Sequence, residues 1–154
     1  MPEQISVERT IRADAGRLYE LAADLPRMGE WSPENTGGKW VKGSTGCAVG
    51  AHFKGTNRNG WRRWSTDVVV TQADPGQRFS FDVTTGPFKV ATWDYRFEQH
   101  GDTTTVVQTW TDNRAMFART VAPLIAGVRD RTERNRQNME ATLAKMAAAA
   151  EAQR

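Results

Sequence analysis

Apolar and polar residues alternate in several segments of the chain, which is the pattern of half-buried β-strands. The alternating segments are Gln4–Ile11, Lys39–Lys42, Ala51–Arg58, Trp61–Gln72, Arg78–Thr85, Phe88–Gln99 and Thr103–Thr111. Turn residues separate them, and Asn59-Gly60 is a strong signal for a two-residue hairpin. Since the connections are short, we expect about seven antiparallel strands, with sequence neighbours paired in one sheet.

A helix is predicted directly after the first strand, because apolar residues recur at helical spacing between positions 18 and 25. Asp14 is the expected N-cap of this helix, and Pro26 marks its end or a kink. A short second helix is predicted over Arg27–Trp31, and a loop over Glu34–Gly38.

A long helix is predicted over Met116–Gln153, with an apolar stripe that runs from Val121 to Met146. Pro123 predicts that the helix either starts there or bends there in its first turns. The run Ala147–Ala150 favours helix but is barely amphipathic, so we expect this end of the helix to fray.

Alternation places many aromatic side chains on one face of the predicted sheet. These inward residues are Phe53, Trp64, Phe79, Phe81, Trp93, Tyr95, Phe97 and Trp110. In the last strand either Val106, Gln108 and Trp110 or the residues between them point inward, and Trp110 favours the first set. Such a face either packs as a filled core or lines a cavity. Inward polar groups on Asn57, Gln108 and Tyr95 need partners, which favours a mostly apolar ligand cavity.

Composition is that of one globular domain spanning 1–154, with 38% hydrophobic and 25% charged residues. No apolar run approaches the roughly 20 residues of a membrane span, and no secretory signal is seen at the start, so we expect a cytoplasmic protein. Cys47 is the single cysteine, which excludes an internal disulfide. With only His52 and His100 besides, we expect no metal and no cofactor.

The net charge of +3 is mild, so we interpret it as surface charge and do not expect a nucleic-acid partner. One basic cluster, formed by Arg58, Arg62 and Arg63, keeps open the alternative of an interaction module.

Residues for catalysis are sparse. The chain has no glycine-rich phosphate loop, HExxH or CxxC pattern. Cys47 lies in a glycine-rich loop and is expected to be too solvated for activation. The histidines are expected at the surface, and the acids of the strands are expected on outward faces: Asp67, Asp82, Asp94 and Glu98. Glu34, at a loop, and Tyr95 remain as weak catalytic candidates.

Several short motifs, in this order and spacing, resemble the SRPBCC superfamily, which has the START-type, pollen-allergen-like helix-grip fold. The motifs are Ile11-Arg12-Ala13-Asp14, Ala23-Asp24-Leu25, Trp31-Ser32-Pro33, Gly50, Phe53-Lys54-Gly55-Thr56-Asn57, Trp93-Asp94-Tyr95-Arg96-Phe97-Glu98, Gly101-Asp102-Thr103-Thr104 and Asn138-Met139-Glu140-Ala141-Thr142-Leu143. The resemblance covers nearly the whole chain and is greatest to the bacterial polyketide cyclase/dehydrase-like branch. It implies an α+β fold in which a curved antiparallel sheet wraps around the C-terminal helix, with a hydrophobic cavity between them.

The leading hypothesis is a carrier or sensor that binds a small hydrophobic or aromatic molecule, such as a lipid, polyketide or isoprenoid-like compound, in that cavity. The alternative is a metal-free cyclase or dehydratase acting in the same cavity, and the third is a chaperone activator or other interaction module. Either a monomer or a homodimer is compatible with the sequence. The predicted ligand-binding residues are Trp31, Phe53, Asn57, Trp64, Phe79, Phe81, Trp93, Tyr95, Gln108, Trp110, Val121, Leu124, Ile125 and Val128.

Overall fold

In the computed structural model, which describes residues 3–30, 35–85, 88–112 and 131–152, the strands form one seven-stranded antiparallel sheet. Its order is β1-β7-β6-β5-β4-β3-β2, so each strand from β2 to β7 pairs with its sequence neighbour and β1 returns to pair with β7. The predicted strand count and antiparallel pairing are confirmed. The strands are β1 (Glu3–Ile11), β2 (Asn35–Val41), β3 (His52–Asn59), β4 (Arg62–Asp74), β5 (Arg78–Thr85), β6 (Phe88–His100) and β7 (Thr103–Asp112).

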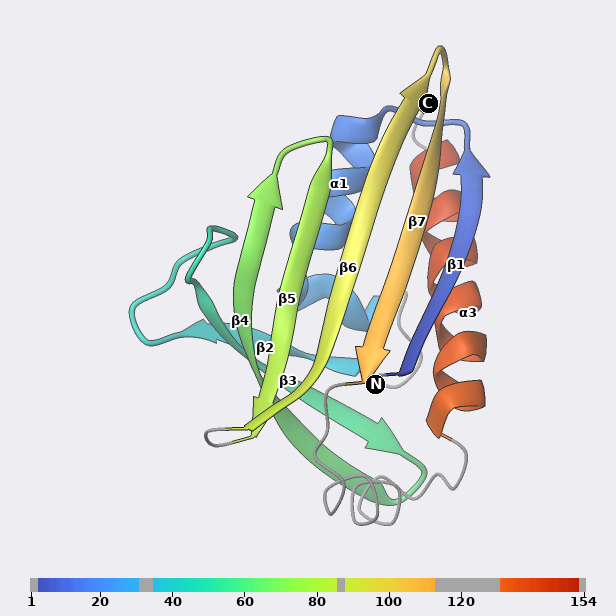
Figure 1. Cartoon of the computed structure of the whole chain (residues 1–154). Coiled ribbons are helices and arrows are strands. Elements are labelled where there is room, and N and C mark those ends of the chain that lie inside the picture. Colours follow the sequence, from blue (N-terminus) through green and yellow to red (C-terminus); the bar gives the residue numbers. More distant parts are fainter. Residues whose placement is uncertain (1–2, 31–34, 86–87, 113–130, 153–154) are drawn as a thin grey trace.

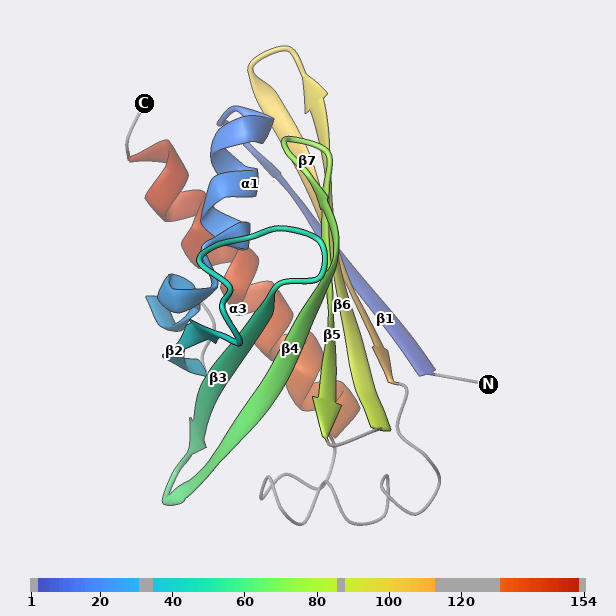
Figure 2. The same ribbon diagram turned by 90° about the vertical axis from the view of Figure 1, so that its left-hand side faces the viewer.

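The helices lie on one side of the sheet (Figures 1 and 2). Helix α1 (Ala15–Ala23) and the 3-10 helix η1 (Leu25–Glu30) follow β1, and α3 (Arg131–Glu151) lies along β1. We call the face of the sheet toward the helices the inner face and the opposite one the outer face. This two-layer arrangement is the helix-grip fold that the sequence predicts.

The start of α1 is fixed as predicted. The Asp14 side chain accepts a hydrogen bond from the Gly16 N–H at 3.0 Å, which makes it the N-cap. A further bond comes from the Ala15 N–H to Gln99 Oε1 at 2.7 Å and ties this helix start to the end of β6. The short second helix begins two residues earlier than predicted, at Leu25, and Trp31 lies outside the described residues.

The loop prediction for Glu34–Gly38 is wrong for residues 35–38, which form the first half of β2. Gly38 has a φ of 152° and lies against the Phe53 ring of β3, where a Cβ would come within 2.6 Å of the ring's Cζ. A glycine pair that resembles a loop therefore serves a close approach between strand and ring.

The alanine-rich end of α3 is packed, so the predicted fraying is wrong. Ala147 and Ala150 are only 2% and 3% exposed, and the Arg12 N–H donates to Glu151 Oε2 at 3.0 Å. Small side chains let the helix lie close to its neighbours, an effect that amphipathicity does not measure. The predicted stripe is otherwise confirmed at Met139, Leu143 and Met146, while residues 113–130, including Pro123, lie outside the described residues.

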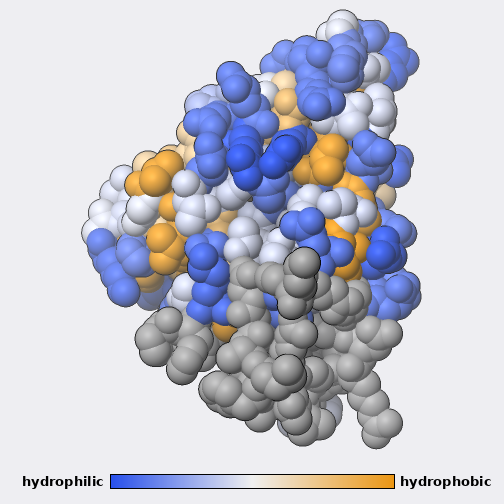
Figure 3. Space-filling model, viewed as in Figure 1, coloured by the Kyte–Doolittle hydropathy of each residue, from blue (hydrophilic) through white to orange (hydrophobic). Residues whose placement is uncertain are grey.

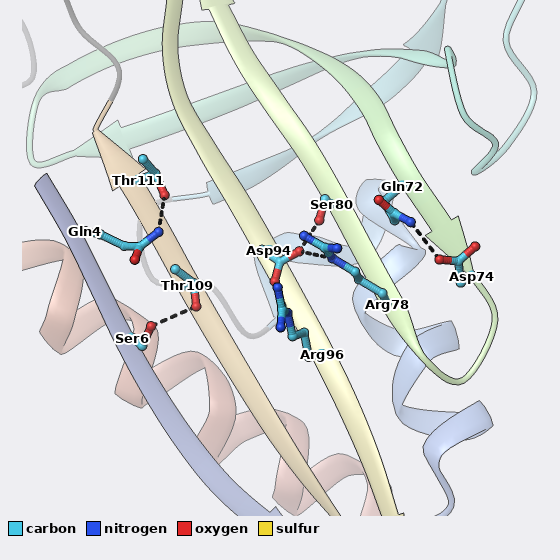
Figure 4. A network of polar contacts seen from close by, with 10 residues as sticks. All are labelled: Gln4, Ser6, Gln72, Asp74, Arg78, Ser80, Asp94, Arg96, Thr109 and Thr111. Atoms are coloured by element: carbon cyan, nitrogen blue, oxygen red, sulfur yellow. Dashed lines mark hydrogen bonds and ion pairs between the residues drawn. The ribbon is translucent and has the colours of Figure 1, made fainter. Parts of the chain in front are cut away.

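The outer face is largely polar (Figure 3). Hydroxyl pairs link β1 to β7, and Figure 4 shows Asp94 of β6 held among Arg78, Ser80 and Arg96. No helix of the described residues is long and apolar enough to cross a membrane.

Candidate functional site

The inner face carries the predicted aromatic surface. Most of its side chains are almost fully buried, and Trp110, at 3% exposed, settles the ambiguous direction of β7 as predicted. The buried members of the predicted site are Phe53 on β3, Phe79 and Phe81 on β5, Tyr95 on β6, and Gln108 and Trp110 on β7.

One end of this surface lies beneath α1. The Tyr19 ring of α1 meets the rings of Phe79 and Phe97 edge-on, with centroids 6.3 and 6.1 Å away. Tyr95 stacks between its neighbours, 6.4 Å from Phe97 and 6.3 Å from Phe79. This end is therefore closed by side chains that pack as a core.

The opposite end is only partly covered. Trp93 and Trp110 lie side by side on β6 and β7, with centroids 6.4 Å apart, and Trp93 is half-buried. Asn57 and Trp64, near the β3–β4 hairpin, are also half-buried. The Asn57 Nδ2 donates weakly to Thr66 Oγ1 at 3.4 Å. Aromatic surface on the inner face is thus accessible at this end and buried at the α1 end.

Between the two ends lies a polar pair. Tyr95 and Gln108 are directly opposite in the β6–β7 register, and Gln108 Nε2 donates to the Tyr95 hydroxyl at 2.9 Å. Gln108 Oε1 is buried and accepts no hydrogen bond within the described part of the chain. Burial raises the pKa of the Tyr95 phenol above its ordinary range, so this hydroxyl is uncharged at physiological pH and is a poor general base.

The remaining predicted site residues lie outside the described residues. They are Trp31, Glu34, Val121, Leu124, Ile125 and Val128. The part of α3 that is described contributes Met139 and Leu143, both buried toward the sheet, to the helix side of this interior.

A buried acidic residue on the inner side was missed from the sequence. Asp112, 2% exposed, is the last residue of β7 and continues the alternation of Gln108 and Trp110. Asn135, 6% exposed, lies on the buried stripe of α3, as the predicted stripe from Val121 to Met146 requires. Extending the alternation of β7 by one residue would have found Asp112.

Asp94 points outward as predicted, yet it is only 8% exposed. Its carboxylate accepts hydrogen bonds from Arg78 Nε at 2.7 Å, Arg96 Nε at 3.2 Å and the Ser80 hydroxyl. Long arginine side chains on neighbouring strand positions cover it, and alternation alone does not reveal such burial.

Cys47 differs from the prediction of a solvated thiol. It is half-buried against the core, with its Sγ 3.9 Å from the Tyr19 hydroxyl. Burial raises the pKa of the Cys47 thiol, while the hydrogen bond from Tyr19 opposes the change. An uncharged thiol is a weak nucleophile. Cys47 is therefore not activated, and the cause is burial rather than the solvation expected from the sequence.

A separate hollow of about 370 Å³ lies between β1 and α3. Glu8, Arg9, Arg136 and Glu140 contribute to its lining, so it is polar and charged. It differs in place and character from the apolar cavity that the sequence predicts. Among the described residues no group of three or more histidine, cysteine or acidic side chains is placed to hold a metal ion.

The seven-stranded sheet with helices on its inner face, lined by aromatic side chains, defines a helix-grip protein. The chain belongs to the family described as polyketide cyclase / dehydrase and lipid transport, whose model matches residues 2–151. This confirms the resemblance noted from the sequence. No curated protein matches the chain.

Solved structures share the fold. The chain is 27% identical to a polyketide cyclase-like protein, Cgl2372, from Corynebacterium glutamicum, over 99% of this chain and 95% of that one, with a TM-score of 0.60. Ginseng major latex-like protein 151 from Panax ginseng is 13% identical, with 97% of each chain covered and a TM-score of 0.73. The di-domain ARO/CYC protein StfQ of the steffimycin biosynthetic pathway is 12% identical, with a TM-score of 0.75 over 99% of this chain and 52% of that one.

Proposed function

We propose that this protein binds a small hydrophobic or aromatic molecule, of the lipid, polyketide or isoprenoid-like class, between the sheet and α3, and carries or senses it. The observation that supports this most directly is the gradient of exposure along the inner face. Phe79 is fully buried beneath α1, whereas Trp93 and Trp64 are half-buried at the other end. Stacked aromatic surface that is accessible at one end suits an apolar ligand, which gains about 25 cal/mol for each Å² removed from water.

Carriage or sensing has more support than turnover. Tyr95, the catalytic candidate among the described residues, is a buried, uncharged phenol that already accepts a hydrogen bond. Such a group orients a ligand more readily than it accepts a proton from one. The cyclase or dehydratase alternative would need an acid or base elsewhere, and Glu34 lies outside the described residues.

Native mass spectrometry of the protein purified from its own host tests the proposal. We expect a co-purified small molecule whose mass adds to that of the chain. A Trp93→Arg variant places a charge on the accessible aromatic surface and should lose the molecule. Trp61→Arg is the matched control, because Trp61 is 81% exposed at the β3–β4 hairpin, so this variant should keep the molecule. Equal retention by both variants contradicts binding on the inner face.

A further inference from the structure

The polar pair on the inner face offers a ligand two complementary hydrogen-bonding groups. Gln108 Nε2 donates to the Tyr95 oxygen at 2.9 Å, so the Tyr95 proton is directed elsewhere. It has no acceptor within the described part of the chain, and Gln108 Oε1 there has no donor. The Tyr95 O–H and the second N–H of the Gln108 amide are therefore unused donors, and Gln108 Oε1 is an unused acceptor beside them on β6 and β7.

The pair offers both a donor and an acceptor whichever way the Gln108 amide is turned. If the amide turns by 180°, its oxygen accepts the Tyr95 proton, both N–H groups of its NH₂ become unused donors and the Tyr95 oxygen becomes the unused acceptor. In both arrangements at least one donor and one acceptor remain for a third group.

We infer that Tyr95 and Gln108 bind a hydroxyl group of the ligand, so that the ligand is an uncharged, hydroxyl-bearing aromatic or polycyclic molecule. This inference rests on the proposed function and specifies the chemistry of its ligand. A hydroxyl both donates and accepts, so one oxygen satisfies both buried groups. A carboxylate only accepts, so it leaves the unused acceptor of the pair without a donor, and its negative charge is costly to bury.

The position of the pair agrees with such a ligand. Tyr95 and Gln108 lie between the end covered by Tyr19 and the end formed by Trp93 and Trp110. A ring system stacked near the two tryptophans thus reaches the pair with a substituent that points toward α1. The raised pKa of Tyr95 keeps its phenol protonated and able to donate.

The cost of an unpaired buried group predicts that the site prefers a ligand with a hydroxyl to one of the same size without it. A ligand without the hydroxyl leaves a buried acceptor unpaired, which costs more than a hydrogen bond gains. Burial of apolar area alone acts in the opposite direction, because naphthalene is more hydrophobic than 2-naphthol. A preference for 2-naphthol over naphthalene is therefore evidence for the polar pair.

Isothermal titration calorimetry with naphthalene, 2-naphthol and 2-naphthoate, three probes of one ring size, tests the inference. We expect 2-naphthol to bind the unmodified chain roughly 5- to 10-fold more tightly than naphthalene, and 2-naphthoate to bind most weakly. The double variant Tyr95→Phe/Gln108→Leu removes both polar groups at similar volume and is expected to fold. It should bind naphthalene at least as tightly as 2-naphthol. Gln4→Leu on the outer face is the control and should keep the preference of the unmodified chain.

Each other outcome overturns a defined claim. Equal binding of naphthalene and 2-naphthol to the unmodified chain overturns the hydroxyl inference and leaves the proposed function standing. Tighter binding of 2-naphthoate does the same. A preference for 2-naphthol that survives in the double variant also overturns the role of the pair. If none of the three probes binds, both the proposed function for ligands of this size and the inference fail.

Discussion

At the scale of single residues, burial changes chemistry in ways that depend on a few atoms. Cys47 is the clearest case, because a glycine-rich loop that suggests solvent exposure instead places the thiol against Tyr19. Desolvation is the largest cause of the raised pKa of this thiol, so the reactive thiolate forms only at higher pH than in an unfolded chain.

This predicts a measurable difference in alkylation. With iodoacetamide, the labelling rate of folded protein should still rise with pH above about 8.5, where the rate for urea-unfolded protein begins to level off. The Tyr19→Phe variant loses the hydrogen bond that lowers the pKa of Cys47 and should move the folded profile to still higher pH. Identical profiles for folded and unfolded protein would show that the thiol is solvated.

Gly38 supports a second prediction at this scale. Its φ of 152° and the nearby Phe53 ring leave no room for a methyl group, so Gly38→Ala should lower the free energy of unfolding by about 1–3 kcal/mol. Gly46→Ala is the control, because a Cβ there meets no atom within 4 Å. Urea unfolding measures both variants, and equal stabilities would mean that β2 does not approach Phe53.

At the scale of elements, the alanine-rich end of α3 allows a test of whether this helix end is packed against its neighbours. Ala147 is 2% exposed and Ala148 is exposed, although both belong to one alanine run. Ala147→Leu should cost about 1–3 kcal/mol by overpacking, whereas Ala148→Leu should change stability by less than about 0.5 kcal/mol. Thermal and urea unfolding of the pair distinguish a docked helix end from a frayed one, for which the two variants would behave alike.

The elements also show which parts of the fold the sequence can predict. Strands with strict alternation, such as β6 with Trp93, Tyr95 and Phe97, were found within one residue of their ends. Elements built from glycine or alanine were misjudged, because their packing depends on the partner rather than on their own pattern. In β2, which pairs with β3, Gly38 lies close to the Phe53 ring, and the end of α3 docks near Arg12.

At the scale of the whole molecule, the candidate site follows from the same alternation. The inward aromatic set was predictable, because aromatic residues two positions apart on one strand point to the same face of the sheet. The pairing of Tyr95 with Gln108 was not, since it depends on the register between β6 and β7. Asp112 was missed for a similar reason, because the predicted strand stopped one residue before it.

Binding between a sheet and a helix has a consequence for the stability of the whole chain. A ligand that contacts both layers binds the folded state and not the unfolded one, so its free energy of binding adds to that of folding. With 2-naphthol at 100 times its dissociation constant, the free energy of unfolding should rise by about 2.7 kcal/mol. For a chain of this size, that corresponds to an increase in Tm of roughly 5–10 °C.

Thermal unfolding followed by circular dichroism measures this increase, with the dissociation constant taken from calorimetry. The Trp93→Arg variant should unfold at the same temperature with and without 2-naphthol, because its accessible aromatic surface carries a charge. Trp61→Arg should show the full increase, since Trp61 is 81% exposed at the hairpin. An increase that persists in Trp93→Arg would place the ligand elsewhere, and the charged hollow between β1 and α3 would then be the next site to examine by substitution of Arg136.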